Sequence, residues 1–151
     1  MKIALIDNGI ERSLVDYEEE IDFSQGDIGR QIGYEKYNHG TVCAAIITKY
    51  TYRSNLISLK AIEKTDNSCG VLNIKKAIEY CITKEIKLIS MSLGTRSMVD
   101  IAILYNVIDQ AKRANITIVA PGSRNLKVYP AAFDGIIYVD INDKMKGQDA
   151  S

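Results

Sequence analysis

Hydrophobic residues are grouped along this chain in two alternating kinds of segment. The first kind is a short run rich in Ile, Leu and Val, which is typical of a strand in a parallel sheet that is covered on both faces. Four such runs are present, and a fifth segment is a further candidate. The predicted strands are Lys2–Ile6, Leu56–Ile62, Leu88–Ser92, Ile116–Ala120 and Gly135–Ile141.

The second kind is longer and repeats its hydrophobic residues with the period of an α-helix. This pattern predicts helices at Thr41–Tyr50, Val71–Lys84 and Met98–Ala114. Strands that alternate with helices indicate βαβ units, so we expect a three-layer α/β fold with a doubly wound, mostly parallel sheet. The polar segment Glu11–Tyr37 lacks this pattern, and we interpret it as a short helix followed by a surface loop or hairpin.

Composition narrows the possible partners. The 151 residues, 46% hydrophobic and 25% charged, suffice for one domain with one continuous core. Lys plus Arg and Asp plus Glu both number 19, so no net positive charge favours binding to nucleic acid or an anionic membrane. No run approaches the roughly 18 apolar residues that a membrane-spanning helix needs.

Cysteine and histidine usage bears on redox state and metal binding. Cys43, Cys69 and Cys81 are widely separated and odd in number, which favours reduced thiols in a cytoplasmic protein. Cys43 and Cys81 lie on apolar helical faces, where buried thiols are common. Because His39 is the only histidine, we expect no metal site, and no motif indicates a cofactor.

Two residues carry the strongest chemical signal. In an open α/β sheet, ligands bind outside the carboxyl ends of the strands. Asp7 closes the first predicted strand and precedes an Asn8-Gly9 turn, while His39 stands directly before a predicted helix. Taken singly, each residue has an ordinary explanation. Asp7 fits a strand-end carboxylate in a turn, and His39 fits a loop histidine near a helix N-terminus.

Taken together, the strings around these residues resemble the subtilisin-like serine protease family over nearly the whole chain. The family's catalytic aspartate and histidine motifs resemble Ala4–Ile10 and His39–Ala44. The wall of its substrate groove resembles Ile89–Gly94. Its oxyanion strand and the following loop resemble Ile118–Ala120 and Tyr129–Ala131.

The resemblance implies roles for individual residues. Asp7 would hold the His39 ring in one tautomer, and His39 would take the proton of a serine hydroxyl and return it to the leaving amine. An extended peptide would pair with the groove wall by strand addition, and Ser68–Gly70 resembles the opposite rim. The groove residues implied in this way are Ser92, Leu93, Gly94 and Gly70.

The sequence departs from the family at the nucleophile. The family's Gly-Thr-Ser motif follows the oxyanion region, whereas Asp140–Ser151 is polar and lacks it. Three serines come into consideration instead. Ser97 is well explained as the N-cap of the following helix, Ser123 aligns better with the oxyanion region, and Ser92 belongs to the groove wall.

The oxyanion and calcium sites also differ from the family pattern. The family usually has Ala-Gly-Asn where this chain has Ala120–Asn125. Ser123 falls nearest to the family's asparagine, and Asn125 could supply an amide only if the loop shifts by two residues. Only Lys49–Asn55 joins the histidine helix to the next strand, so we expect no calcium there.

Three functions remain open. The first is an endopeptidase domain for extended peptides whose serine comes from another polypeptide or segment, so that this chain alone is inactive. The second is a non-catalytic, peptide-binding pseudoprotease. The third, a nucleotide-binding domain, is disfavoured because a single glycine follows the first strand. An uncovered apolar sheet face would further predict a homo-oligomer or a tightly held partner.

Overall fold

A computed structural model describes residues 1–24, 38–51, 54–62 and 70–140. These residues form one six-stranded sheet in which every neighbouring pair of strands is parallel. The order across the sheet is β2 (Glu19–Asp22), β3 (Asn55–Lys60), β1 (Lys2–Asp7), β4 (Leu88–Met91), β5 (Thr117–Pro121) and β6 (Ile137–Val139). The expectation of a mostly parallel α/β sheet is confirmed.

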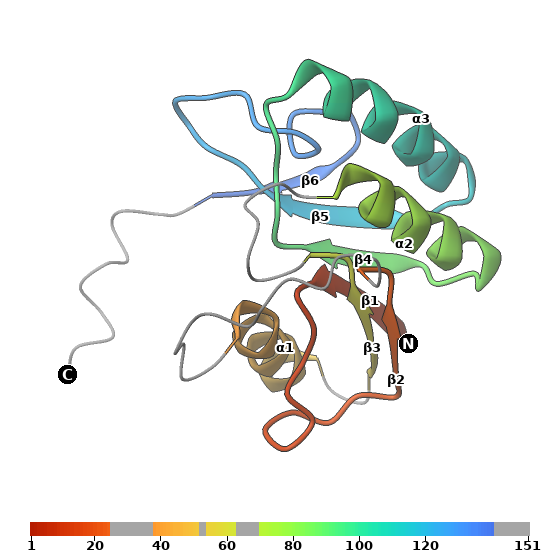
Figure 1. Ribbon diagram of the computed structural model, residues 1–151, viewed down its shortest axis with the longest axis vertical. Helices are drawn as coiled ribbons and strands as arrows, with labels where there is room; N and C mark the ends of the chain where they lie inside the picture. Colours follow the sequence, from red (N-terminus) through yellow and green to blue (C-terminus); the bar gives the residue numbers. More distant parts are fainter. Residues whose placement is uncertain (25–37, 52–53, 63–69, 141–151) are drawn as a thin grey trace.

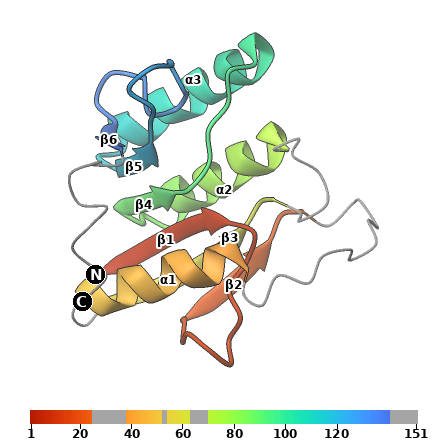
Figure 2. The ribbon, with the colours of Figure 1, turned by 90° about the vertical axis from the view of Figure 1, so that its left-hand side faces the viewer.

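Three helices cover the two faces of this sheet. Helix α1 (His39–Tyr50) lies on one face, and α2 (Val71–Thr83) and α3 (Met98–Arg113) lie side by side on the other. Figures 1 and 2 show these three layers from two directions. All three helices agree with the predicted ones to within a few residues, as do the predicted strands where the structure describes them.

The alternation of side chains along β1 assigns each residue to a face. Ala4 and Ile6 belong to the larger core beneath α2 and α3, whereas Ile3 and Leu5 belong to a smaller core beneath α1. Successive side chains of a strand point to opposite faces. Asp7 has the same parity as Ile3 and Leu5, so it points toward the α1 face.

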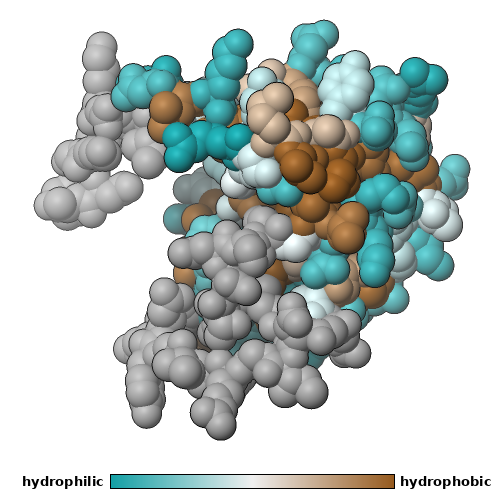
Figure 3. Space-filling model, turned by 45° about the horizontal axis from the view of Figure 1, so that its top comes forward, coloured by the Kyte–Doolittle hydropathy of each residue, from teal (hydrophilic) through white to brown (hydrophobic). Residues whose placement is uncertain are grey.

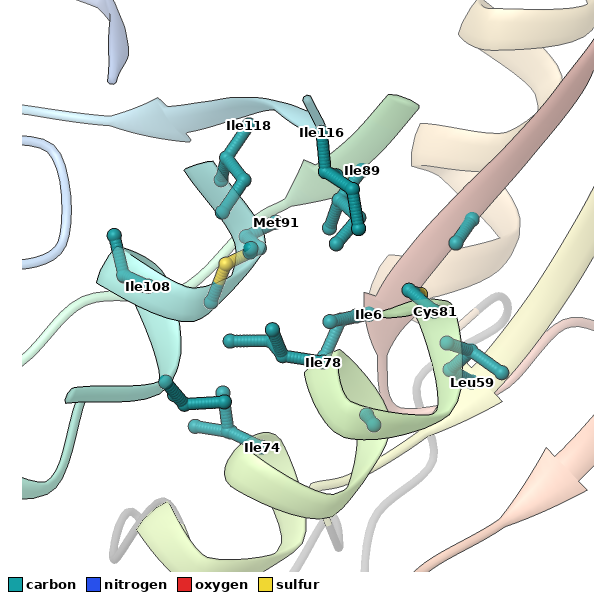
Figure 4. Packing of buried hydrophobic residues seen from close by; sticks show 14 of the residues in the cluster. Ile6, Leu59, Ile74, Ile78, Cys81, Ile89, Met91, Ile108, Ile116 and Ile118 are labelled. Carbon is teal, nitrogen blue, oxygen red and sulfur yellow. The ribbon is translucent and has the colours of Figure 1, made fainter. Parts of the chain in front are cut away.

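The larger core is built almost entirely from aliphatic side chains. In Figure 4, Ile74 and Ile78 of α2 and Ile108 of α3 point toward strand residues such as Ile6 and Ile89. All five are 2% exposed or less. Burial of this kind contributes roughly 1.5–3 kcal/mol for each large aliphatic side chain, so this layer dominates the stability of the fold.

One prediction about secondary structure was wrong. Within Glu11–Tyr37, residues Glu19–Asp22 form the edge strand β2, which pairs in parallel with β3. Three of its four residues are acidic, and no side chain in it is fully buried. An edge strand needs no apolar run because one side and part of both faces remain in water. Residues 25–37 of the same segment lie outside the described residues.

The α1 face of the sheet is only partly covered by the described residues. On β5, Ile118 and Ala120 are buried beneath α3, whereas Val119 and Pro121 on the opposite face are half-exposed. On β6, all three residues are exposed, including Ile137 and Val139. The sheet therefore presents apolar surface beside α1.

Hydrophobic side chains are also exposed where α2 and α3 begin. Leu72 of α2 and Met98 and Val99 of α3 are all more than half exposed. In Figure 3, the top of the molecule, where α3 lies, is turned forward, and hydrophobic residues gather there in a patch bordered by polar ones. The polar surface of the molecule is thus interrupted on this side as well.

Two substitutions on α2 test this division into core and surface. Replacing Ile78 by Ala removes a fully buried side chain, so we expect the free energy of unfolding to fall by about 2–5 kcal/mol. The matched change Leu72→Ala, on the exposed side of the same helix, is expected to alter it by less than about 0.5 kcal/mol. Urea unfolding followed by circular dichroism measures both, and equal losses would contradict the described packing.

Candidate active site

The carboxylate of Asp7 lies at the carboxyl edge of the central part of the sheet. β1 has β3 and β4 as its two neighbours, and Asp7 is the last residue of β1. The residue is only 3% exposed, so its charge needs partners. Oδ1 accepts a hydrogen bond from the backbone N–H of Asn8 at 2.7 Å, and Oδ2 lies 2.9 Å from Nδ1 of His39.

His39 is held at this position by the first turn of α1. Asn38 is the N-cap residue, and its side chain accepts a hydrogen bond from the N–H of Thr41 at 2.7 Å. The hydroxyl of Thr41 in turn accepts from the N–H of Glu11 at 2.8 Å, which links the helix start to the chain after β1. The His39 side chain is 58% exposed, so the ring contacts the buried carboxylate on one side and water on the other.

Asn8 connects both members of this pair. Its backbone N–H donates to Asp7, and its side-chain Oδ1 accepts from the N–H of Gly40 at 2.9 Å. A Cβ atom on Gly40 would overlap the carbonyl oxygen of Gly9, so only glycine allows this close approach. Gly9 itself has φ +95°, a conformation that glycine adopts without strain. The turn after β1 thus fixes the entry of α1.

The edge strand β2 also supports this turn. Oε2 of Glu20 accepts hydrogen bonds from the N–H of Ile10 at 3.1 Å and from the buried hydroxyl of Ser58 at 2.6 Å. Nothing in the sequence selects Glu20, because the segment that carries it predicts a short helix followed by a surface loop or hairpin. An acidic residue in a polar segment carries no signal of its position until the strand pairing is known.

Cys43 is partly buried and packs against the smaller core, as its predicted place on an apolar helical face implies, but it also lies beside the catalytic candidates. Its Sγ is 3.8 Å from Nδ1 and 3.9 Å from Nε2 of His39, and it accepts a hydrogen bond from Ser92 Oγ at 3.3 Å. Burial raises the pKa of the Cys43 thiol, as does the negative charge of Asp7, while the hydrogen bond from Ser92 opposes the rise. The spacing of four residues between His39 and Cys43 on a helix was the signal that could have revealed this contact.

The residues of the expected groove wall follow β4. Ser92 is half-buried and contacts Cys43, and Gly94 is exposed. The side chain of Leu93 is buried in the larger core, so it anchors this segment, and only its main chain remains to contact a ligand. The next residue, Thr95, pairs with Tyr129 through two backbone hydrogen bonds of 2.7 and 2.9 Å.

The expected opposite rim is described only in part. Gly70 is the N-cap residue of α2, and its carbonyl accepts from the N–H of Asn73 at 2.7 Å and that of Ile74 at 3.1 Å. Ser68, which belongs to the same predicted rim, lies outside the described residues. The contacts of Gly70 are those of a helix start, and none joins it to Asp7 or His39.

The remaining candidate residues make no hydrogen bond to Asp7 or His39 in the described part of the chain. Ser97 is the N-cap of α3, as predicted, with Oγ accepting from the N–H of Asp100 at 3.5 Å. Ser123 and Leu126 form an isolated bridge after β5, and Asn125 lies exposed in the turn between them. Within the described ranges, no serine hydroxyl and no side chain of Asn125 hydrogen-bonds to His39.

This arrangement defines a proton-handling pair. A buried carboxylate at Nδ1 favours the tautomer that carries its proton there, and the second ring nitrogen is then left as an acceptor. Such a pair activates a hydroxyl nucleophile that approaches the other side of the ring. The donor atoms of Asp7, His39 and Cys43 also lie within 4.8 Å of one another, so the same residues could hold a metal ion.

The chain belongs to the subtilase family. A family model described as "Subtilase family" matches residues 1–140, which include both members of the pair. By sequence comparison, no curated protein matches the chain closely enough to serve as a relative. The family assignment therefore stands on the match to the family model, and the solved structures add the fold.

Solved structures with this fold include several proteases. A lanthipeptide protease matches with a TM-score of 0.73 and 16% identity over 96% of this chain and 49% of that one. The prenylagaramide maturation protease PagA matches with a TM-score of 0.69 and 14% identity over 95% and 55%. The epidermin leader peptide processing serine protease of Staphylococcus aureus matches with a TM-score of 0.62 and 15% identity over 91% and 45%. The chain thus spans about half the length of these proteins.

A separate observation concerns membranes. Of the helices in the described ranges, none combines the length and the apolar character that crossing a bilayer requires.

The bridging role of Asn8 can be tested by substitution. In Asn8→Ala, the buried N–H of Gly40 loses its acceptor, so we expect the free energy of unfolding to fall by about 1–3 kcal/mol. The backbone amide signal of Gly40 should also shift in an NMR spectrum. The control Asn106→Ala, at an exposed position of α3, should leave both quantities nearly unchanged. An equally small effect at Asn8 would argue against the bridge.

Proposed function

We propose that this chain is the part of a subtilisin-like serine endopeptidase that supplies the aspartate and the histidine of a Ser-His-Asp triad. The observation that carries the proposal is the 2.9 Å contact between the buried carboxylate of Asp7 and Nδ1 of His39, at the carboxyl edge of a parallel sheet. Membership of the subtilase family supports it, since both residues lie within the matched range.

In this proposal, His39 is the general base and Asp7 orients it. The carboxylate holds the proton on Nδ1 and stabilises the imidazolium that forms when His39 takes the proton of a serine hydroxyl. His39 then returns this proton to the leaving amine. Loss of the orienting aspartate leaves the wrong tautomer populated and lowers turnover by about 10⁴-fold in enzymes of this type.

The nucleophilic serine would come from a polypeptide segment outside these 151 residues. Ser92 is engaged with Cys43 and Ser97 caps α3, so neither is free to attack a substrate beside His39. An oxyanion donor would come from the turn after β5, from Ser123 or Asn125. A well-placed donor of this kind contributes about 3–4 kcal/mol of transition-state stabilisation.

The proposed substrate is an extended peptide. The main chain of Ser92, Leu93 and Gly94 would pair with it by strand addition, with Gly70 on the opposite rim. The buried side chain of Leu93 would hold this edge rigid, and the missing side chain of Gly94 makes room for Val128, which packs against it. Because one structural neighbour is named for leader peptide processing, we propose a precursor peptide in the cytoplasm as the substrate class.

A second candidate function is a peptide-binding pseudoprotease. It is favoured by one observation, namely that no serine within the described ranges hydrogen-bonds to His39. In that case, Asp7 and His39 would form a structural pair, and the groove would bind peptides without cleaving them. The two functions differ in what they require of His39.

Active-site labelling distinguishes these functions. In a complex of this chain with the segment that supplies the serine, a fluorophosphonate probe should label that serine. The change His39→Ala should abolish labelling and lower kcat by at least about 10⁴-fold, because the general base is lost. The exposed control Asn106→Ala should label like the unmodified protein. Absence of labelling in every complex, with peptide affinity unaffected by His39→Ala, would favour the pseudoprotease.

The half-covered α1 face leads to a separate proposal about assembly. Val119 of β5, and Ile137 and Val139 of β6, leave apolar surface beside α1, and surfaces of this kind are rarely left in water. We propose that a second copy of the chain, or the serine-bearing segment, covers them.

Sedimentation tests this assembly. The isolated chain should sediment as a dimer or larger species at micromolar concentration. Val119→Lys should shift it toward monomer, because a charge on this face opposes burial. Asn106→Lys, which adds the same charge at an exposed polar site on α3, should not. A stable monomer of the unmodified chain would show that a second copy does not cover this surface.

A further inference from the structure

Cys43 has no role in the proposed peptidase chemistry, yet it contacts the residue on which that chemistry depends. Its Sγ is nearly equidistant from the two ring nitrogens of His39, at 3.8 and 3.9 Å. Asp7 lies on the same side, with Oδ2 2.9 Å from Nδ1. A carboxylate, an imidazole and a thiol therefore converge from the end of β1 and the first turns of α1.

The donor atoms all lie within 4.8 Å of one another, which is within reach of one bound cation. Bond lengths of about 2.1 Å to nitrogen or oxygen and 2.3 Å to sulfur imply about 3.4 Å between nitrogen and oxygen and about 3.6 Å between nitrogen and sulfur. The observed values are 2.9 Å from Nδ1 to Oδ2 and 3.8 Å from Nδ1 to Sγ. Because Sγ is almost equally far from Nε2, at 3.9 Å, it lies beside the ring rather than next to the Nδ1 position that Oδ2 faces. Binding one cation to all three atoms therefore requires the Cys43 side chain to rotate toward Oδ2.

The charges of this donor set also suit a divalent cation. A carboxylate and a thiolate together carry two negative charges, which balance a dication, and a neutral imidazole completes three ligands. The hydroxyl of Ser92, 3.3 Å from Sγ, donates a hydrogen bond that stabilises the thiolate. Three protein ligands leave one position for water, as in open zinc sites.

We propose that Asp7, His39 and Cys43 bind a thiophilic divalent cation of the Zn²⁺ type, and that the bound cation switches off the proton-transfer pair. Binding requires only these three side chains. The regulatory half rests on the proposed function: with the cation on Nδ1, the proton that Asp7 holds there is displaced and His39 no longer acts as the oriented base. The sequence alone predicts no such site, because His39 is the only histidine.

Cobalt titration of the 151-residue chain tests the binding half without any peptidase assay. Co²⁺ should produce the near-ultraviolet band of a thiolate-to-cobalt bond, and Zn²⁺ should abolish it by displacement. Cys43→Ser should remove the band, and Asp7→Asn should weaken affinity by at least about 10-fold, since even outer-shell changes cost 10–100-fold. Circular dichroism checks that both variants are folded.

The other two cysteines provide the matched control. A double variant, Cys69→Ser with Cys81→Ala, leaves Cys43 as the sole thiol and should retain the band, because Cys81 is buried beneath α2 in the other core. A band that persists in Cys43→Ser, or no band in the unmodified chain, would overturn the proposed site.

Inhibition by the cation has to be measured in the complex of this chain with the segment that supplies the serine. For each protein, the rate with Zn²⁺ is divided by its own rate without Zn²⁺. This ratio should fall well below one for the unmodified complex and stay near one for Cys43→Ser. Equal inhibition of both would overturn regulation through this site. Cobalt binding by a chain that forms no active complex would leave the site intact and reject the peptidase function instead.

Discussion

The organisation of the site follows from the burial of one carboxylate. Asp7 is almost wholly removed from water, and a charge there is costly unless fixed donors surround it. The backbone of Asn8 supplies one donor and the ring of His39 supplies the other. Satisfying this carboxylate therefore constrains three parts of the chain at once: the end of β1, the turn that follows it, and the first residue of α1.

The topology explains how α1 reaches that carboxylate. From β2 to β3 and from β3 to β4, the chain moves in the same direction across the sheet, yet α1 and α2 lie on opposite faces. The two connections consequently have opposite hands, although such crossovers between parallel strands are right-handed in about 98% of cases. With both connections of one hand, α1 would lie beside α2 and α3, on the face away from Asp7. The uncommon connection is thus what allows His39 to meet the carboxylate.

How well the sequence predicted each element depended on whether its hydrophobic pattern was set by burial. β1, β4 and α2 are buried against neighbours on at least one face, so their patterns carried the required period. β2 is an acidic edge strand, and nothing in Glu19–Asp22 distinguishes it from a loop before its pairing with β3 is known. The pairing of Asp7 with His39 could be expected from the two motifs, whereas the roles of Glu20 and Cys43 depend on contacts that composition does not reveal.

For Cys43, its position on α1 and its distance from the His39 ring have to be considered together. On the helix, positions four residues apart lie on one face, so Cys43 packs against the smaller core and also lies beside the His39 ring. Burial raises the pKa of the Cys43 thiol, as does the charge of Asp7, so the thiol stays protonated and unreactive in the proposed chemistry of His39. A soft cation reverses this balance, because the metal replaces the thiol proton and draws sulfur, imidazole and carboxylate to one centre. In the proposed site, the contact that leaves the thiol silent in proton transfer would also place its sulfur within reach of a bound cation.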